Sequence, residues 1–535
     1  MEITEESKER ETGSKFAPEL PSLLATLYAP ILPFLKNIKI ERSGPREHQP
    51  RDILLPQGYV AELVTTGLNA PVHCAFDPDG YAYIGESGHK IDSPPRIVRV
   101  NLQTGEQEIY YTFPEDQWIL SGALTGLCWY SGYLYVMNTD RLVRLRPGGL
   151  AEDLLTDLPG VGDHQANYPV IGPDGKLYYG QGCATNAGVV GADDYAFEWL
   201  PRFPEFHDIP AQDLTLTGRN FSYRNVLGNV TESVESGAYS PFGVPTQPGQ
   251  VIPAGDRPTG AIMRCNLDGS DLEVFASGLR NPYGLGFDTE GRLYCTEHGM
   301  DERGQRYIVD DPDDFYLLEQ GRWYGWPDYA SGYRLDDRRW GEGGRNREPL
   351  IENPPETEPP IPLVEFSPHV AANGFDICKS PAFGFEGQAF VACFGDLAPI
   401  TTLTRAVSPM GFKVVRVDIE NRQVHDFAVN RIAGPASKLP HGGFERPSHC
   451  QFGPDGALYV VDFGEIEIAP EAGGIRMQKR TGALWRIRRS GGPQGALPPE
   501  PVKVPLYLLQ GALLFGGIIA AGLSLRWLMR RLRGK

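Results

Sequence analysis

The segment 170–179, VIGPDGKLYY, reads as two short β-strands joined by a tight turn. Pro173 suits the second position of a type I turn and Asp174 the third, and Gly175 tolerates the backbone conformation that follows. Apolar residues precede the turn, and an apolar and aromatic run follows it, which is typical of strands that face a core. The segment therefore predicts a β-hairpin.

The same pattern recurs through most of the chain. Six segments combine a Gly, one variable residue, Leu or Ala, and an aromatic residue; they begin at Gly80, Gly132, Gly175, Gly291, Gly387 and Gly456. A four-stranded propeller blade needs about 40–50 residues, so the extra length is expected in loops, chiefly 183–260 and 301–360. We therefore predict an all-β fold, a six-bladed β-propeller over residues 55–490. The strand 59–68 is expected to close the ring as an outer strand. An open β-solenoid or two sandwiches fit less well, because the repeat is continuous.

Composition excludes several classes of protein. The net charge of −18 argues against a nucleic-acid partner. The eight cysteines form no CxxC pair, which excludes zinc ribbons, thioredoxin-like motifs and c-type haem attachment. The sequence also contains no GxGxxG, P-loop or GxSxG motif, so nicotinamide, ATP-dependent and α/β-hydrolase functions have no support.

The C-terminus has the pattern of a membrane anchor. Residues 506–525 carry no charge and are long enough to cross a bilayer. The basic tail 526–535 follows, which predicts a single transmembrane helix with a cytoplasmic tail and an extracytoplasmic propeller. A Pro/Gly-rich linker, 491–505, joins this helix to the propeller. The N-terminal segment 1–54 is charged at first and then apolar, interrupted by prolines.

Polar side chains gather where the first strand of most repeats begins. They are Asn69 and His73 in the first repeat, Asp163, His164 and Gln165 in the third, Arg280 and Asn281 in the fourth, Ser367 and His369 in the fifth, and Glu445, Arg446 and His449 in the sixth. In a propeller these positions share one channel mouth, so we expect a small-molecule pocket there. His164 is the best candidate for a general base, since neutral imidazole accepts a proton near physiological pH, and Asp163 is expected to tune or orient it.

Three motifs carry a resemblance to a known family: DHQ with IGPDGKLYY, GLRNPYGLGF with LYCTEHG, and GRWYGWPDY. Over roughly residues 55–490 the chain resembles the glucose/sorbosone dehydrogenase family. That family consists of six-bladed propellers and includes the soluble-type pyrroloquinoline quinone (PQQ) sugar dehydrogenases. The resemblance implies a sugar (aldose) dehydrogenase, which oxidises a sugar hydroxyl by hydride transfer to PQQ, and the C-terminal segment makes it a membrane-anchored one. Electrons would then pass to a membrane quinone or a cytochrome.

The resemblance also implies roles for individual residues. His164 matches the base that takes the proton of the anomeric hydroxyl, and Arg280 matches the arginine beside the reacting quinone oxygen. Asn281 matches a further quinone contact. Gly299 and Met300 match positions whose backbone carbonyls hold calcium, a cation that prefers oxygen ligands and polarises the quinone carbonyl.

The sequence departs from the family pattern at several cofactor contacts. Asp396 stands where the family's quinone-binding enzymes have a basic residue, and Ser367 where they have a stacking aromatic. The family has a basic pair in the sixth repeat, and of this pair only Arg446 remains. The predicted cofactor-binding residues are thus Arg280, Asn281, Arg446 and Gln165. Each lost charge-assisted contact weakens binding by about 1.5–3 kcal/mol.

Two other functions remain open from the residues alone. His73, His164, His369 and His449 could ring a transition metal, since imidazole suits iron, copper and zinc. A binding or scaffold propeller without catalysis is the other alternative, favoured by Asp396. In either case the loop 183–260 is expected to cover the mouth and set specificity.

Overall fold

The computed structural model describes residues 46–114, 123–146, 148–196, 198–341, 346–397, 409–438, 442–469 and 474–501. Within these residues no helix is long and apolar enough to span a membrane. The predicted transmembrane helix 506–525, its basic tail and nearly all of the N-terminal segment lie outside the described residues.

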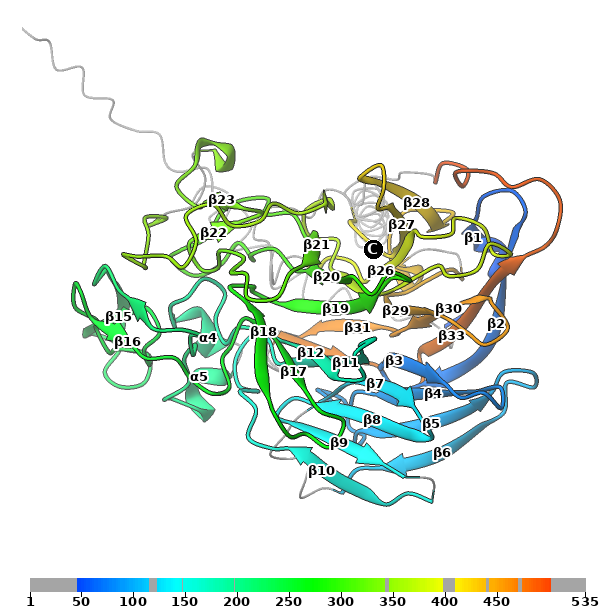
Figure 1. Ribbon diagram of the computed structural model, residues 1–535, viewed down its shortest axis with the longest axis horizontal. Coiled ribbons are helices and arrows are strands. Elements are labelled where there is room, and N and C mark those ends of the chain that lie inside the picture. Colours follow the sequence, from blue (N-terminus) through cyan, green and yellow to red (C-terminus); the bar gives the residue numbers. More distant parts are fainter. Residues whose placement is uncertain are drawn as a thin grey trace, which may run out of the picture. The chain divides into compact units, whose positions relative to one another are not determined.

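Six antiparallel sheets form the blades of a β-propeller, and each contains at least four strands (Figure 1). Blade 1 comprises β3 (Pro71–Phe76), β4 (Tyr81–Glu86), β5 (Arg96–Asn101) and β6 (Gln107–Thr112). Blade 2 comprises β7 (Leu124–Tyr130), β8 (Tyr133–Asn138), β9 (Arg141–Leu145) and β10 (Ala151–Leu155). Blade 3 comprises β11 (Ala166–Ile171), β12 (Leu177–Gln181), β17 (Ala261–Cys265) and β18 (Glu273–Ser277).

The second half of the chain builds the other three blades. Blade 4 comprises β19 (Pro282–Phe287), β20 (Leu293–Glu297), β21 (Asp314–Leu318) and β24 (Val364–Glu365). Blade 5 comprises β25 (Ala372–Ile377), β26 (Ala389–Cys393), β27 (Lys413–Asp418) and β28 (Gln423–Asn430), with β1 (Ile53–Leu54) added at its outer edge. Blade 6 comprises β29 (Pro447–Phe452), β30 (Leu458–Asp462), β33 (Gly482–Arg489) and β2 (Tyr59–Leu68).

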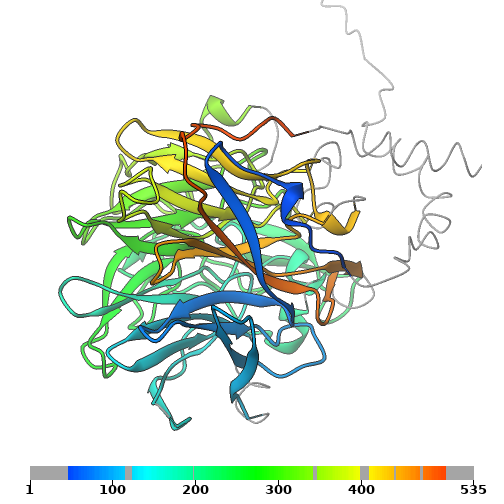
Figure 2. The same ribbon diagram turned by 90° about the vertical axis from the view of Figure 1, so that its right-hand side faces the viewer.

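The ring is closed by the N-terminal strand, as the sequence predicts. Strand β2 runs antiparallel to β33, with Tyr59 opposite Arg489 and Leu68 opposite Gly482. Figure 2 shows β2 in blue beside β33 in orange. Blade 6 therefore joins the two ends of the repeat region, which leaves only short, protected sheet edges.

The six repeat glycines occupy equivalent turns between the first two strands of each blade. All have positive φ, from 75° at Gly456 to 87° at Gly80. A Cβ at Gly132 or Gly175 would meet no atom within 4 Å, so backbone conformation rather than space requires glycine there. The predicted correspondence of the repeats is thus confirmed.

Neighbouring blades share hydrophobic clusters. Tyr83 and Ile97 of blade 1 pack with Leu127 of blade 2, for example. Blades approach closely at Gly126, where a Cβ would lie 1.9 Å from the Cβ of Tyr168 in blade 3. Such dense packing fixes where each blade places the residues at its inner end.

The long segment 183–260 forms a side structure of its own. It contains α4 (Asp193–Ala196), α5 (Trp199–Arg202), β13 (Leu214–Thr215), β14 (Asn220–Arg224), β15 (Ser233–Gly237) and β16 (Val251–Ile252). Its apolar side chains, such as Phe221 and Tyr239, share a core cluster with Trp326 and Trp340.

The remaining elements are short. They are η1 (Pro50–Asp52), η2 (Arg338–Trp340), η3 (Ala436–Lys438), β22 (Tyr329–Ala330), β23 (Tyr333–Arg334), β31 (Ile466–Ala469) and β32 (Gly474–Met477).

Candidate active site

All six blades contribute to a central cavity of about 370 Å³, and four of the eight predicted site residues line it: His164, Gln165, Arg280 and Gly299. Its lining includes His89, Thr125, His164, Gln165, Asn167, Arg280, His298, Gly299, Asp301, Asp313, His369, Asn373, Asp396, Ser448 and Phe463. A larger cavity of about 590 Å³ lies beside Arg219 and Tyr329, away from the predicted base. We assign the site to the central cavity because the candidate base and the guanidinium of Arg280 meet there.

The loop 183–260 does not cover this cavity, contrary to expectation. Within the described chain, none of its residues belongs to the cavity lining. It packs instead against the segment around Trp326 and Trp340, where its apolar side chains are buried. The loop supports the site from outside the cavity. Its residue Asn186, for example, accepts a hydrogen bond from Arg280, which lines the cavity.

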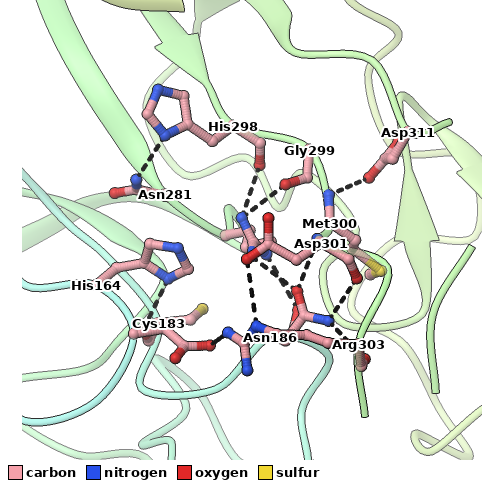
Figure 3. Close-up of polar contacts among 12 residues, drawn as sticks. His164, Cys183, Asn186, Asn281, His298, Gly299, Met300, Asp301, Arg303 and Asp311 are labelled. Carbon is pink, nitrogen blue, oxygen red and sulfur yellow. Dashed lines mark hydrogen bonds and ion pairs between the residues drawn. The ribbon is translucent and has the colours of Figure 1, made fainter. Parts of the chain in front are cut away.

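His164 is held as a neutral imidazole with one nitrogen left to accept a proton (Figure 3). Its Nδ1 lies 3.1 Å from the carbonyl oxygen of Cys183. Because a carbonyl can only accept, Nδ1 carries the proton and Nε2 bears the free lone pair. Burial, and then the positive charge of Arg280, lowers the pKa of His164 well below its usual value. His164 is therefore uncharged near neutral pH, as a general base must be.

The predicted contact between Asp163 and His164 is replaced by another arrangement. The Asp163 carboxylate accepts a short hydrogen bond from Arg303, whose guanidinium also lies 2.7 Å from Asp193. Burial raises the pKa of Asp163, while the charge of Arg303 opposes that rise. Asp163 thus partly neutralises a buried arginine behind the base, and the carbonyl of Cys183 orients the imidazole instead.

Arg280 is fixed by a network that the sequence does not reveal. Its Nε donates to the carbonyl of Asn186 at 3.1 Å and its NH2 to Asn186 Oδ1 at 2.8 Å. Its NH1 donates to the carbonyl of Gly299 at 2.7 Å. Only 4% of Arg280 is exposed. The structure therefore brings Arg280 together with one of the two carbonyls predicted to hold calcium.

The peptide units of Gly299 and Met300 are pinned by carboxylates. The Gly299 N–H donates to Asp313 Oδ1 at 3.0 Å, and the Met300 N–H donates to Asp311 Oδ2 at 2.6 Å. Gly299 lines the central cavity, whereas Met300 lines a small neighbouring void of about 30 Å³. Burial raises the pKa of Asp311 to about 7.

Asn281 and His298 form a second fixed pair. His298 Nε2 lies 3.1 Å from the carbonyl of Ala372, so it carries the proton, and Nδ1 accepts from Asn281 Nδ2 at 2.9 Å. The Asn281 Oδ1 accepts from Asn167 at 3.1 Å. His298 is not among the site residues predicted from the sequence, although its position directly before Gly299 in LYCTEHG is a usable signal. Asn186 was not predicted either, and no local pattern marks that residue.

The side-chain oxygens of two amides in the cavity lining lack a hydrogen-bond partner. They are Oε1 of Gln165 and Oδ1 of Asn373, both buried. Buried polar atoms in proteins almost always have partners, so these atoms indicate space for a polar ligand or water.

Arg446, a predicted cofactor contact, binds backbone carbonyls of the neighbouring blade in this structure. Its NH1 donates to the carbonyls of Gly395 and Asp396 at 3.0 and 3.1 Å, and its guanidinium lies 5.0 Å from the ring centre of Phe412. It is absent from the cavity lining, whereas Asp396 is present there. Arg446 therefore supports the loop that presents Asp396. Ser367 does not line the cavity either.

The hypothetical histidine ring does not form. His73 and His449 stack face to face with ring centres 3.7 Å apart, and neither belongs to the cavity lining, whereas His164 and His369 do. Among the described residues, the one cluster of metal-type ligands contains only His369 of the four. Four imidazoles around one transition metal are thus ruled out by this arrangement.

Comparison with known proteins agrees with the resemblance seen in the sequence. The family model for glucose/sorbosone dehydrogenase matches residues 252–405. Quinoprotein glucose dehydrogenase B of Acinetobacter calcoaceticus is 25% identical over 307 residues, which cover 52% of this chain and 54% of that protein. The chain thus spans about half the length of this curated relative.

Two solved structures are similar to this chain at low identity. The holo form of the pyranose dehydrogenase PQQ domain from Coprinopsis cinerea has a TM-score of 0.51 at 14% identity, covering 82% of this chain and 98% of that one. The PQQ-bound aldose sugar dehydrogenase of Streptomyces coelicolor has a TM-score of 0.45 at 17% identity, covering 81% and 99%. The family model and the curated relative confirm the resemblance of this chain to the glucose/sorbosone dehydrogenase family, and the matched residues 252–405 include Arg280, Asn281, Gly299 and Met300.

Proposed function

We propose that this protein is a sugar (aldose) dehydrogenase that uses PQQ and calcium. The observation that carries the proposal is the free Nε2 of His164, which shares one cavity with the guanidinium of Arg280. A neutral base and a fixed cation in a largely buried site are what removal of a hydroxyl proton and stabilisation of a developing negative charge require.

The residues present fit such a cofactor in most respects. The unpartnered oxygens of Gln165 and Asn373 can accept hydrogen bonds from a polar ligand. Asp301 and Asp313 line the cavity beside the Gly299 carbonyl, and this set of oxygens suits a hard divalent cation. A carbonyl has two lone pairs, so Gly299 can serve a cation while Arg280 remains bonded to it.

Asp396 is the exception. It lines the cavity and would repel a cofactor carboxylate placed near it. Its position predicts weaker quinone binding than a basic residue there would give, by about 1.5–3 kcal/mol for each lost charge-assisted bond.

The protein groups then have distinct tasks. When bound, the quinone supplies a hydride acceptor and calcium polarises its carbonyl. His164 takes the hydroxyl proton at Nε2 while Nδ1–H stays bonded to Cys183, which keeps the imidazole aligned. Arg280 directs N–H groups at the oxygen that gains negative charge, and Asn186 holds the guanidinium in that orientation.

We extend this proposal to the membrane. The uncharged segment 506–525 and the basic tail 526–535 support a single-pass anchor with the propeller outside the cytoplasm. Such an anchor would keep the site close to a membrane quinone or cytochrome that accepts the electrons.

A propeller that binds a ligand without catalysis is the second candidate. It is favoured by the described part of the cavity lining, where Asp301, Asp313 and Asp396 outnumber the one arginine, Arg280. This charge balance suits a neutral or cationic ligand better than an anionic cofactor.

Titration of the purified protein with calcium and PQQ distinguishes the two candidates. The dehydrogenase proposal expects saturable PQQ absorbance changes that need calcium, and dye-linked oxidation of an aldose. If the protein binds no PQQ and oxidises no aldose, the binding propeller is the better account.

A further inference from the structure

Three side chains from two loops meet at the rim of the central cavity. Glu302 and Asp310 lie on the segment 298–313 between β20 and β21, and His369 lies between β24 and β25. Each offers one ligand atom, and these atoms all lie within 4.8 Å of one another. In the part of the chain that the structure describes, this is the one such group of three.

The imidazole of His369 provides an independent sign of a ligand. Its Nε2 is buried and makes no hydrogen bond, and only 9% of the side chain is exposed. The nearest carboxylate oxygen, Glu302 Oε1, is 3.7 Å away, too far for a hydrogen bond. A buried ring nitrogen without a hydrogen-bond partner, directed at two carboxylates, needs an explanation.

The spacing fits a small divalent cation. A nitrogen and an oxygen that are each about 2.1 Å from one Zn²⁺ lie about 3.4 Å apart at the tetrahedral angle. The separation of 3.7 Å between His369 and Glu302 therefore needs an adjustment of only a few tenths of an ångström. An imidazole with two carboxylates suits zinc and related transition cations better than calcium, which prefers oxygen ligands throughout.

We propose that Glu302, Asp310 and His369 bind one divalent transition cation of the zinc class. The two carboxylates balance the charge of the cation, and a neutral imidazole supplies the third ligand. Three protein ligands leave a fourth position for water. The cation would fasten the segment 298–313, which carries Gly299, to the loop before β25.

This site is distinct from the calcium position discussed above, and the inference does not depend on the proposed function. Its ligands are side chains, whereas Gly299 and Met300 would contribute carbonyls. The test therefore uses the protein without PQQ or sugar, so failure of one proposal leaves the other standing.

Cobalt binding tests the proposal directly. The untagged, full-length protein is stripped of metal and titrated with Co²⁺, whose visible absorption reports ligation by nitrogen and oxygen. We expect one equivalent to bind and Zn²⁺ to displace it. His369→Gln, Glu302→Gln and Asp310→Asn should each weaken Co²⁺ binding at least ten-fold.

His425→Gln is the matched control, because it makes the same substitution on β28 of blade 5. It should bind Co²⁺ as the unaltered protein does. Thermal melts check that each variant folds, and Zn²⁺ should raise the melting temperature of the unaltered protein but not that of His369→Gln. Absence of stoichiometric binding, or equal binding by His369→Gln, would overturn the proposal and leave an ion pair between His369 and Glu302.

Discussion

The stacked pair of His73 and His449 should make the protein sensitive to acid. Both rings are buried, at 4% and 2% exposure, and none of their four nitrogens makes a hydrogen bond. Burial lowers the pKa of His449 to about 3, and burial followed by the charge of His449 lowers that of His73 well below its usual value. Both rings are therefore neutral in the folded protein.

The sign and size of the effect follow from linkage. An unfolded histidine has a pKa of about 6.5, so below that pH the unfolded chain binds a proton that folded His449 does not. The neutral ring contributes fully above pH 6.5, and its contribution is lost as the pH falls toward the folded value. Each pH unit lowers the free energy of unfolding by about 1.36 kcal/mol. Between pH 7.5 and 4.5 the loss from His449 alone is about 2.7 kcal/mol.

Urea unfolding of the unaltered protein and of His449→Leu at pH 7.5, 6.0 and 4.5 measures this loss. Leucine cannot bind a proton, so the variant should gain about 2.7 kcal/mol relative to the unaltered protein as the pH falls. Carboxyl groups with raised pKa values, such as Glu297 at about 8, instead make the folded protein more stable as the pH falls. Both proteins contain these groups, so their effect largely cancels in the difference between the two. A stability difference that does not change with pH would refute the reasoning.

Three further predictions concern the site and the membrane. Asn186→Ala removes the Oδ1 acceptor of Arg280 NH2 but keeps the backbone carbonyl that Nε binds, and it should lower kcat/KM by about 10- to 100-fold in dye-linked assays, as expected for a lost hydrogen bond to a charged group; an unchanged kcat/KM would show that Arg280 is held otherwise. Asp396→Lys should tighten PQQ binding about ten-fold or more in absorbance titrations, whereas equal or weaker affinity would show that no cofactor carboxylate lies near this position. Protease added to intact cells should digest the propeller, and its protection there, with cleavage in inverted vesicles, would reverse the proposed topology.

The fold could be predicted from the sequence because it repeats. Each blade needs a left-handed residue at the turn between its first two strands, and glycine meets that need at Gly80, Gly175 and the four equivalent positions. The closing strand β2 was also predictable, since a propeller protects its edges by pairing the two ends of the repeat region. Because the same glycine turn recurs in all six blades, one sequence is enough to recognise the repeat.

The site was predictable only in part. His164 and Arg280 each stand two residues before the first strand of a blade, so the repeat fixes their place at the cavity. Asn186 and Glu302 lie on long segments without periodic pattern, and only tertiary packing brings them to the site. The direction of a side chain was equally hidden: Arg446 has the predicted position in its blade, yet its guanidinium binds backbone carbonyls rather than the cavity.

Replacement of His164 tests the central claim most directly. General-base catalysis contributes about 10²- to 10⁴-fold, so His164→Ala should lower kcat for aldose oxidation by that factor while PQQ affinity and the melting temperature change little. Because the pKa of His164 is lowered, the unaltered enzyme should keep its kcat/KM as the pH falls below 6.5, the usual histidine value. Aldose oxidation by His164→Ala at the unaltered rate, with PQQ bound, would contradict the assignment of His164 as the base.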